Sequence, residues 1–256
     1  MIRVGVVGAT GRVGAEVCRA THADADLELA AGISRSKAGE KATDALGLQG
    51  SELVLAESLD SFVEAGVEVA VDFTSGDFAA EHVAWAIAHG VHIVVGTTGF
   101  DVDDAWRGAP VGVVVASNFA IGAVLMQRFA AEAARYLPAV EIVELHHDGK
   151  TDAPSGTAAA TADAVAASRE EAWAGPSGES LPGVRGGERA GIRIHSVRLP
   201  GLVAHQEVIF GGQGQTLTIR HDSTDRTSFV PGVLRAIRWA PDHPGLTVGL
   251  DAILDA

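Results

Sequence analysis

The sequence of 256 residues is poor in cysteine, in basic residues and in long apolar runs. Its single cysteine, Cys18, excludes an intrachain disulfide or a site of several cysteines, and favours a reducing, cytoplasmic location. Acidic residues outnumber basic ones by 33 to 19, with no cluster of Lys and Arg, which argues against a nucleic-acid partner. No apolar run approaches the length of a membrane span, and glycines follow the first apolar residues too early for a signal peptide.

Apolar residues make up 47% of the chain, enough to bury a sizeable core. Up to about residue 119, short apolar runs alternate with helical patterns. The runs IRVGVV, LELAAGI, VEVAVDF, HIVVG and VGVVVA are typical of buried parallel strands between helices. This part of the chain predicts an α/β fold, a Rossmann-like doubly wound nucleotide-binding domain.

The pattern changes after residue 119. A helical segment ending at Pro138 precedes VEIVELHH, a helix beginning near Ser155, and the alternating runs IRIHSVRL, HQEVIF and TLTIRH. These predict a second, α+β domain with a mixed or antiparallel sheet, interrupted by a long mobile loop over Gly175–Gly191. The end of the chain adds a helix and an apolar tail that packs back on the first domain. We therefore expect domains formed by residues 1–119 with 226–256, and by 120–225.

The segment GVVGATGRVG places Gly8, Gly11 and Gly14 after the first strand and before a helix. Glycines at this point allow a tight turn and let the backbone approach a pyrophosphate, whose charge is met by the helix N-terminus. Thr10 occupies the position of the middle glycine in GxGxxG. A purely structural turn is the alternative, because a glycine motif alone is weak in a chain with 31 glycines.

The end of the second strand reads GISRSK and bears on the choice of cofactor. Selectivity for NAD usually needs a carboxylate about 20 residues after the glycines, whereas NADP needs a cation near its 2′-phosphate. Ser34, Arg35 and Lys37 offer donors and positive charge, and no acid. A solvated loop is the alternative, since exposed Arg and Lys are common.

The stretch ELHHDGKTDAPSGT combines two histidines with Lys150, one of only three lysines. Lysine can release a proton and arginine cannot, so a proton-active Lys150 is one interpretation. His146 and His147, at a strand end, point to opposite faces and are not expected to share a metal, and no HExxH helix or Cys/His spacing supports zinc. Imidazole titrates near neutral pH and suits general acid catalysis, although a structural histidine is the commoner case.

Ser155 is predicted to cap the helix that follows. This leaves the amides of Gly156 and Thr157 directed at incoming negative charge, which predicts a carboxylate-binding site beside an acid and a cation. A helix cap alone would explain Ser155, but not the histidines or the lysine.

Six segments occur in the order in which one enzyme family has them: VGVVGATGRVG, VDFT, VVGTTGF, SNFAIGA, ELHHDGKTDAPSGTA and RTSFVPGV. On these residues the chain closely resembles the 4-hydroxy-tetrahydrodipicolinate reductase family, also called dihydrodipicolinate reductase, over nearly its whole length. The block ELHH..K.DAPSGTA is highly specific to that family. The resemblance implies that NADPH or NADH reduces a cyclic imine with two carboxylates, in lysine and diaminopimelate biosynthesis.

The resemblance also implies roles for single residues. His146 is the implied proton donor or acceptor, and Lys150 a second proton donor or the partner of a substrate carboxylate. The implied substrate-binding residues are His147, Gly156 and Thr157. The implied cofactor contacts are Gly8, Ala9, Thr10, Gly11, Arg12, Val13, Phe73, Thr74, Gly96, Thr97, Thr98, Ala116, Ser117, Asn118 and Phe119, with Ser34, Arg35 and Lys37 at the second strand. No metal, nucleic-acid or membrane partner is implied, and the assembly would be a homotetramer built through the second domain's sheet.

Two positions depart from the family pattern. Gly149 precedes the lysine where members often have a histidine or an aromatic residue, and Ser34 replaces an acid that many members carry, which favours NADPH over NADH. Two other functions remain open at this point. One is a different dehydrogenase on the same nucleotide-binding domain, acting on an aspartate-derived aldehyde, which would not need the DAPSGT block. The other is a nucleotide sensor, for which His146 and Lys150 would be dispensable.

Overall fold

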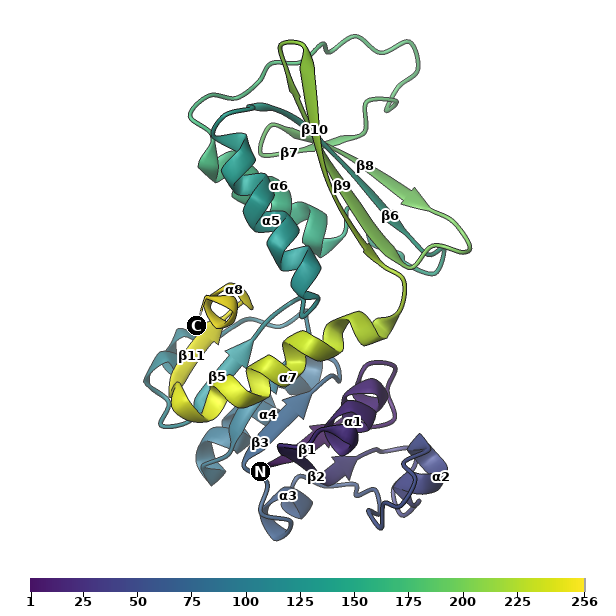
Figure 1. Cartoon of the computed structure of the whole chain (residues 1–256), viewed down its shortest axis with the longest axis vertical. Helices are drawn as coiled ribbons and strands as arrows, with labels where there is room; N and C mark the ends of the chain where they lie inside the picture. The colour runs from purple at the N-terminus through teal and green to yellow at the C-terminus, as the bar shows by residue number, and fades with distance from the viewer. Residues whose placement is uncertain (256) are drawn as a thin grey trace. The chain divides into compact units, whose positions relative to one another are not determined.

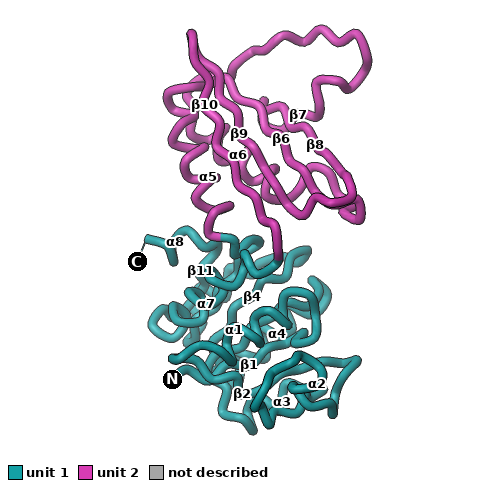
Figure 2. Tube along the Cα trace, turned by 45° about the vertical axis from the view of Figure 1, so that its right-hand side comes forward, with its two compact units in different colours: residues 1–120, 226–256 teal, residues 121–225 magenta. Residues whose placement is uncertain are grey.

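The computed structural model of the protein describes residues 1–255, which divide into two compact units (Figure 2). Unit 1 contains Met1–Ala120 together with the chain from Arg226 onward, and unit 2 is Ile121–Asp225. The chain therefore leaves unit 1 once, forms unit 2 as one continuous segment, and returns.

The core of unit 1 is a six-stranded sheet in the order β11-β5-β4-β3-β1-β2. All neighbouring strands are parallel, and the order reverses at β1, which has β2 on one side and β3 on the other. The strands are β1 (Ile2–Val7), β2 (Leu27–Ile33), β3 (Val69–Asp72), β4 (His92–Val95), β5 (Gly112–Val115) and β11 (Gly245–Val248). Val and Ile dominate because parallel strands are buried on both faces.

Helices cover both faces of this sheet (Figure 1). Those of unit 1 are α1 (Gly14–Ala23), α2 (Ala42–Leu46), α3 (Asp60–Glu64), α4 (Gly76–His89), α7 (Val230–Trp239) and α8 (Asp251–Leu254), with 3₁₀ turns η1 (Asp104–Gly108), η2 (Arg226–Phe229) and η3 (Ala240–Asp242). On one face, Phe62 of α3, Val83 of α4 and Trp106 of η1 pack with Ile93 and Val113 of the sheet. Within residues 1–255, no helix has the length and apolar character needed to span a membrane.

Unit 2 is a five-stranded mixed sheet in the order β10-β9-β6-β8-β7 with two helices on one face (Figure 1). Only β6 and β8 are parallel neighbours, and the other pairs are antiparallel. The elements are α5 (Ile121–Ala134), β6 (Ala139–His146), α6 (Gly156–Ser168), β7 (Gly187–Arg189), β8 (Ile192–Arg198), β9 (Ala204–Gly212) and β10 (Gln215–Ser223). Ile142, Ile192, Val208 and Phe210 of the sheet pack against Met126 and Val165 of the helices.

The segment predicted as a loop over Gly175–Gly191 contains a short strand, so that part of the prediction is wrong. Gly187–Arg189 forms β7 and pairs antiparallel with the start of β8. The connection is only Ala190 and Gly191, both with positive φ, 51° and 73°. Two such residues form the tight hairpin turn whose twist matches that of the strands. Ala-Gly is not the usual signal for this turn, and the predicted fold class as a whole is confirmed.

The C-terminal segment packs tightly on β5. A side chain at Gly112 would place its Cβ 2.1 Å from the carbonyl oxygen of Ala240 in η3. We expect Gly112→Ala to lower the free energy of unfolding by about 1–3 kcal/mol, because the added methyl group collides with main-chain atoms that cannot move aside easily. At Gly108 a Cβ meets nothing within 4 Å, so Gly108→Ala should change the free energy of unfolding by less than about 0.5 kcal/mol. Urea unfolding of both variants checks this, and equal losses would contradict the packing.

Candidate active site

The turn between β1 and α1 depends on its glycines. Gly8 has φ of +76°, which favours glycine, and its carbonyl accepts a 2.8 Å bond from the amide of Gly11. A Cβ on Gly14 would lie 2.2 Å from that same carbonyl oxygen. The turn is therefore built from bare backbone, and it carries five further predicted cofactor residues: Ala9, Thr10, Gly11, Arg12 and Val13.

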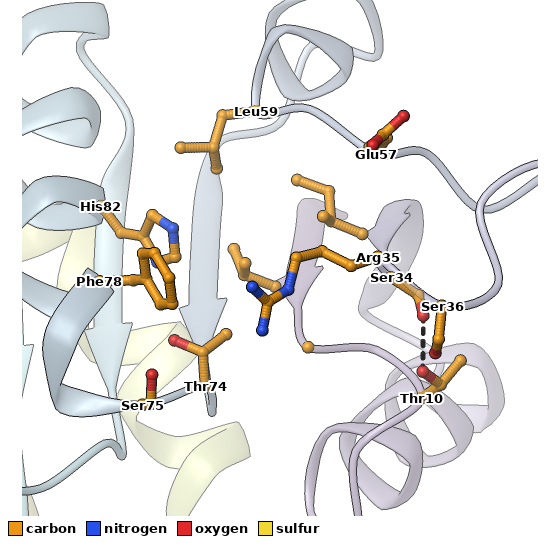
Figure 3. A pocket seen from close by; sticks show the side chains of 13 residues that line it. Thr10, Ser34, Arg35, Ser36, Glu57, Leu59, Thr74, Ser75, Phe78 and His82 are labelled. Atoms are coloured by element: carbon orange, nitrogen blue, oxygen red, sulfur yellow. Dashed lines mark hydrogen bonds between the residues drawn. The ribbon is translucent and has the colours of Figure 1, made fainter.

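A cavity of about 460 Å³ opens at the C-terminal ends of β1, β2 and β3, where the strand order reverses (Figure 3). Open α/β sheets bind their ligands at such a point. Five predicted cofactor residues line it: Gly8, Thr10, Ser34, Arg35 and Thr74. Its other lining residues are Val7, Ile33, Ser36, Glu57, Leu59, Ser75, Phe78 and His82.

The polar groups at the end of β2 differ in where they lie. The Ser34 hydroxyl is buried and bonds to the Thr10 hydroxyl at 2.6 Å, so it links β2 to the glycine turn. Arg35 reaches across the cavity to the Phe78 ring, with 5.2 Å between the guanidinium carbon and the ring centroid (Figure 3). Lys37 does not line this cavity, and its ammonium pairs with Glu40 at 3.2 Å on an exposed turn. The cation at the cavity is therefore Arg35.

A buried carboxylate, Asp72, organises the ends of β3 and β4. Its Oδ1 accepts bonds from the Thr74 amide at 2.8 Å, the Thr74 hydroxyl at 2.7 Å and the Thr97 hydroxyl at 3.0 Å. Its Oδ2 lies 2.5 Å from Nδ1 of His82, a cavity residue. Burial opposes ionisation of Asp72, but the bonds from His82 and Thr74 outweigh it and lower its pKa.

The remaining predicted cofactor residues lie on the loops after β3, β4 and β5. A Cβ on Gly96 would lie 2.0 Å from the Phe73 ring, so only glycine fits there. Phe73 contacts Phe119 edge to face, with 5.8 Å between ring centroids. The Asn118 side chain accepts a 2.9 Å bond from the Ala120 amide. The other predicted cofactor residues on these loops are Thr98, Ala116 and Ser117.

These features fit a dinucleotide. The glycine turn lies directly before α1, as pyrophosphate binding needs, and a side chain at Gly14 would collide with the main chain of Gly8 and disrupt the turn. The guanidinium of Arg35, the hydroxyl groups and the aromatic ring of Phe78 that line the cavity beside it suit a phosphate, a sugar and a base.

In unit 2 the strand β6 carries a buried acid next to a histidine. Glu144 and His146 lie two residues apart and so on the same face of the strand. Glu144 is fully buried, and its Oε2 lies 2.5 Å from Nδ1 of His146. The sequence predicted a strand that includes His147, but β6 ends at His146. His147 lies in the following turn, where its carbonyl accepts a bond from the Lys150 amide at 3.1 Å.

Ser155 caps α6, which confirms that prediction. Its hydroxyl accepts a 3.2 Å bond from the Ala158 amide, and its own amide donates to Oε1 of Glu144 at 3.2 Å. Gly156 and Thr157 form the first turn of this 13-residue helix. The positive end of the helix therefore lies beside the strand end that carries His146.

Two cations complete the site. Arg198 of β8 binds both carboxylate oxygens of Glu144, each at 2.8 Å. Lys150 binds both carboxylate oxygens of Asp152 at 2.8 Å, and this bond holds the pKa of Asp152 below its ordinary value. Through Glu144 and Arg198 the structure thus links His146, the start of α6 and the main chain of Lys150. An imidazole, a helix N-terminus and an ammonium are groups that bind anions.

The predictions from sequence missed Glu144 and Arg198. The spacing of Glu144 to His146 was a signal, since an acid two residues before a histidine shares its strand face. Arg198 has no local signal, because it meets His146 only through the parallel register of β6 and β8. The predictions also missed Asp72, and Glu57, Phe78 and His82 in the cavity.

The charge of Glu144 has a measurable consequence. Burial opposes its ionisation, yet the bonds from His146 and Arg198 lower its pKa from 4.5 to about 2. Because the pKa is lower in the folded state, this stabilisation is complete above about pH 4.5 and is lost as the pH falls towards 2. We expect Glu144→Gln to cost roughly 3–5 kcal/mol near pH 7, because Arg198 is left without its partner. The difference from the wild type should shrink below pH 4.5.

Urea unfolding between pH 7 and pH 3 measures this difference. Glu132→Gln is the matched control, because it removes a carboxylate from an exposed pair with Arg135 and should change stability little at any pH. A difference for Glu144→Gln that stays constant with pH would contradict the assigned charge.

Known proteins are similar to this chain in sequence and fold. The family models described as "Dihydrodipicolinate reductase, N-terminus" and "Dihydrodipicolinate reductase, C-terminus" match residues 2–119 and 122–254. A 4-hydroxy-tetrahydrodipicolinate reductase of Nocardia farcinica is 50% identical over 99% of both chains. A solved structure of a dipicolinate-bound dihydrodipicolinate reductase from Paenisporosarcina sp. TG-14 has a TM-score of 0.87 at 40% identity, over 99% of both chains.

More distant structures share only the fold. Aspartate semialdehyde dehydrogenase II of Vibrio cholerae has a TM-score of 0.58 at 10% identity, over 93% of this chain and 97% of its own.

The two family models and the 50% identical relative confirm the family predicted from the six segments, and with it an NAD(P)H-dependent oxidoreductase of lysine and diaminopimelate biosynthesis. Matched over nearly all of its length, this chain belongs to the dihydrodipicolinate reductase family.

Proposed function

We propose that this chain reduces 4-hydroxy-tetrahydrodipicolinate to tetrahydrodipicolinate with a nicotinamide cofactor, and that His146 donates the proton. The observation that carries the proposal is the 2.5 Å contact between His146 Nδ1 and the buried carboxylate of Glu144. An ionised carboxylate only accepts hydrogen bonds, so Nδ1 carries a proton and donates a hydrogen bond to Glu144. Nε2 is then the nitrogen that gains and loses a proton, as in other carboxylate–imidazole pairs.

The cofactor would be held by unit 1, and the substrate by unit 2. The glycine turn, the cavity and the loops after β3, β4 and β5 support a dinucleotide site in unit 1. The strand end, Lys150 and the start of α6 support a site for an anion in unit 2. The predicted domain roles, cofactor binding in one domain and substrate binding with oligomerisation in the other, follow this division.

When bound, the cofactor would supply a hydride to the conjugated cyclic imine that is left once 4-hydroxy-tetrahydrodipicolinate has lost its 4-hydroxyl group as water. The reduced ring then needs one proton, which His146 would deliver. Lys150 and the first-turn amides of Gly156 and Thr157 would bind the two carboxylates, with His147 as a further substrate contact. Lys150 acts either as a second proton donor or only as a charge partner. The ion pair of its ammonium with the Asp152 carboxylate, at 2.8 Å, supports a role in carboxylate pairing.

The chemistry is tested with freshly generated substrate by following nicotinamide absorbance. We expect His146→Gln to fold and bind cofactor normally while kcat falls about 10²–10⁴-fold, because glutamine keeps a similar size but cannot deliver a proton. His89→Gln, at the exposed end of α4, is the matched control and should keep wild-type kcat. Near wild-type turnover in His146→Gln would overturn the assignment, and unfolding midpoints exclude a loss of stability as the cause.

Lys150→Arg separates the two roles of the lysine, because it keeps the charge but removes an accessible deprotonation. A rise in KM alone would indicate charge pairing, whereas a fall in kcat as well would indicate proton donation. Lys41→Arg, on the exposed surface, is the control. If both variants behave alike, Lys150 has neither role.

Cofactor choice is the next proposal: NADPH is used at least as well as NADH. Ser34 offers a neutral hydroxyl where an acid would repel the 2′-phosphate, and Arg35 at the same cavity supplies a positive charge. Glu57 also lines this cavity, and its charge limits how strongly NADPH is preferred.

Ser34→Glu should therefore lower NADPH affinity more than NADH affinity, because the new carboxylate repels the 2′-phosphate. Calorimetric titration with each cofactor measures the change. Gln49→Glu adds the same charge at an exposed position away from the cavity and should leave both affinities unchanged. A wild type that clearly prefers NADH, or equal losses for both cofactors in Ser34→Glu, would contradict the proposal.

A cytoplasmic homotetramer completes the proposal. The helices of unit 2 cover one face of its sheet, and the alternation along β6 turns Val143 and Leu145 to the other face. This face supports assembly through the sheet, because apolar side chains on an uncovered face favour association. The single cysteine supports a reducing compartment.

A further inference from the structure

Arg198 ends β8, the strand that pairs in parallel with β6, and its register partner there is His146. Its side chain is largely buried, with 19% of its surface exposed. We propose that Arg198 is a positioning residue of the reductase site, which holds the imidazole of His146 and the main chain of Lys150 in one arrangement. This inference rests on the proposed function, because it assigns a role to a further residue of that site.

The guanidinium of Arg198 has five N–H donors, and five hydrogen bonds account for them. Nη1 and Nη2 each donate to one oxygen of Glu144 at 2.8 Å. Nε donates to the Lys150 carbonyl at 3.2 Å, and Nη2 to the Asp152 carbonyl at 2.6 Å. Nη1 also donates to the carbonyl of Val197 at 2.8 Å. An ammonium has only three donors, so lysine cannot replace this set.

The two bonds to Glu144 determine how His146 is oriented. Two parallel N–H···O bonds from one guanidinium fix the plane of a carboxylate. The Oε2 oxygen that accepts from Nη1 of Arg198 is the same atom that lies 2.5 Å from Nδ1 of His146. A carboxylate released from Arg198 would be free to turn, and the imidazole bonded to it would turn with it.

The two bonds to main-chain carbonyls determine where Lys150 lies. The carbonyls of Lys150 and Asp152 are on either side of Thr151, and one guanidinium binds both. The side chains of the same two residues are bonded to each other, Nζ to carboxylate, at 2.8 Å. Main chain and side chain of the lysine segment are thus fixed relative to the guanidinium that also holds Glu144.

Stabilisation of the fold is the competing explanation, because any cation opposite a buried carboxylate contributes to it. The two roles differ in what a lysine at this position would restore. Lysine supplies the positive charge that Glu144 needs, but it cannot bind two carboxylate oxygens in one plane and two carbonyls at once. A role limited to charge predicts that lysine suffices, whereas a positioning role predicts that it does not.

Arg198→Lys is therefore the decisive variant, with Arg135→Lys at the exposed end of α5 as the matched control. We expect Arg198→Lys to keep a folded unit 2 and its cofactor affinity while kcat falls about 10²-fold, since small displacements of reacting groups have effects of this size. Arg198→Ala should lose more activity and regain part of it when guanidinium ion is added. Guanidinium should not raise the kcat of Arg198→Lys or of the control.

A spectroscopic measurement tests the position of His146 without substrate or cofactor. In protein labelled with ¹⁵N-histidine, the Nδ1 proton bonded to Glu144 should resonate far downfield, and His146→Gln identifies the signal by removing it. We expect Arg198→Lys to move this signal upfield and Arg135→Lys to leave it unchanged. The signal is independent of turnover, so it tests the positioning role even if the wild type does not reduce the proposed substrate.

Two results would overturn the inference. One is an Arg198→Lys variant with unchanged kcat and an unchanged Nδ1 signal, which would show that charge alone suffices. The other is an Arg198→Lys variant that fails to fold, or that loses activity only in proportion to the fraction unfolded, which would show that the bonds serve stability and not placement.

Discussion

A carboxylate out of contact with water is stable only where hydrogen bonds and opposite charge replace its hydration. Glu144 is such a group, fully buried and ionised down to about pH 2. Its partners come from three places: His146 on its own strand, Arg198 on the neighbouring strand, and the amide of Ser155 at the start of α6. Burial of this one charge therefore requires the end of β6, the start of α6 and β8 to lie together, and the candidate site is formed where they do.

Unit 1 uses the same physical device at another place. Asp72 is also fully buried, and it also lies 2.5 Å from the Nδ1 of a histidine, here His82 at the cavity. Its other oxygen binds Thr74 and Thr97 and so joins the ends of two parallel strands. In both units a buried acid orients the polar groups at strand ends, and in unit 1 these are the ends at which open α/β sheets bind their ligands.

These local arrangements also explain how a chain with a net charge of −14 can bind anionic ligands. Arg35 lies at the cavity of unit 1, and Lys150 and the start of α6 lie beside His146 in unit 2. Each is a cation or helix dipole placed at short range, where its effect is not averaged over the surface. The acidic remainder of the surface is compatible with this, because screening in salt solution limits its reach to about 8–10 Å.

Local sequence determined much of this protein. Buried parallel strands need continuous apolar runs such as IRVGVV, and strands covered on one face need alternation such as VEIVELHH. Glycines mark turns in which a side chain would not fit. The fold class, the glycine turn and the cap at Ser155 were therefore all predictable. The ion pair of Arg198 with Glu144 was not predictable in this way, because it spans 54 residues. Lys37, predicted as a cofactor contact, pairs with its near neighbour Glu40 in the structure. The hairpin at Ala190 and Gly191 likewise formed where its residues are not typical of the turn. Patterns of period two or of fixed spacing can be recognised in the local sequence, whereas the partner of a buried charge is decided only when sheet register brings two strands together.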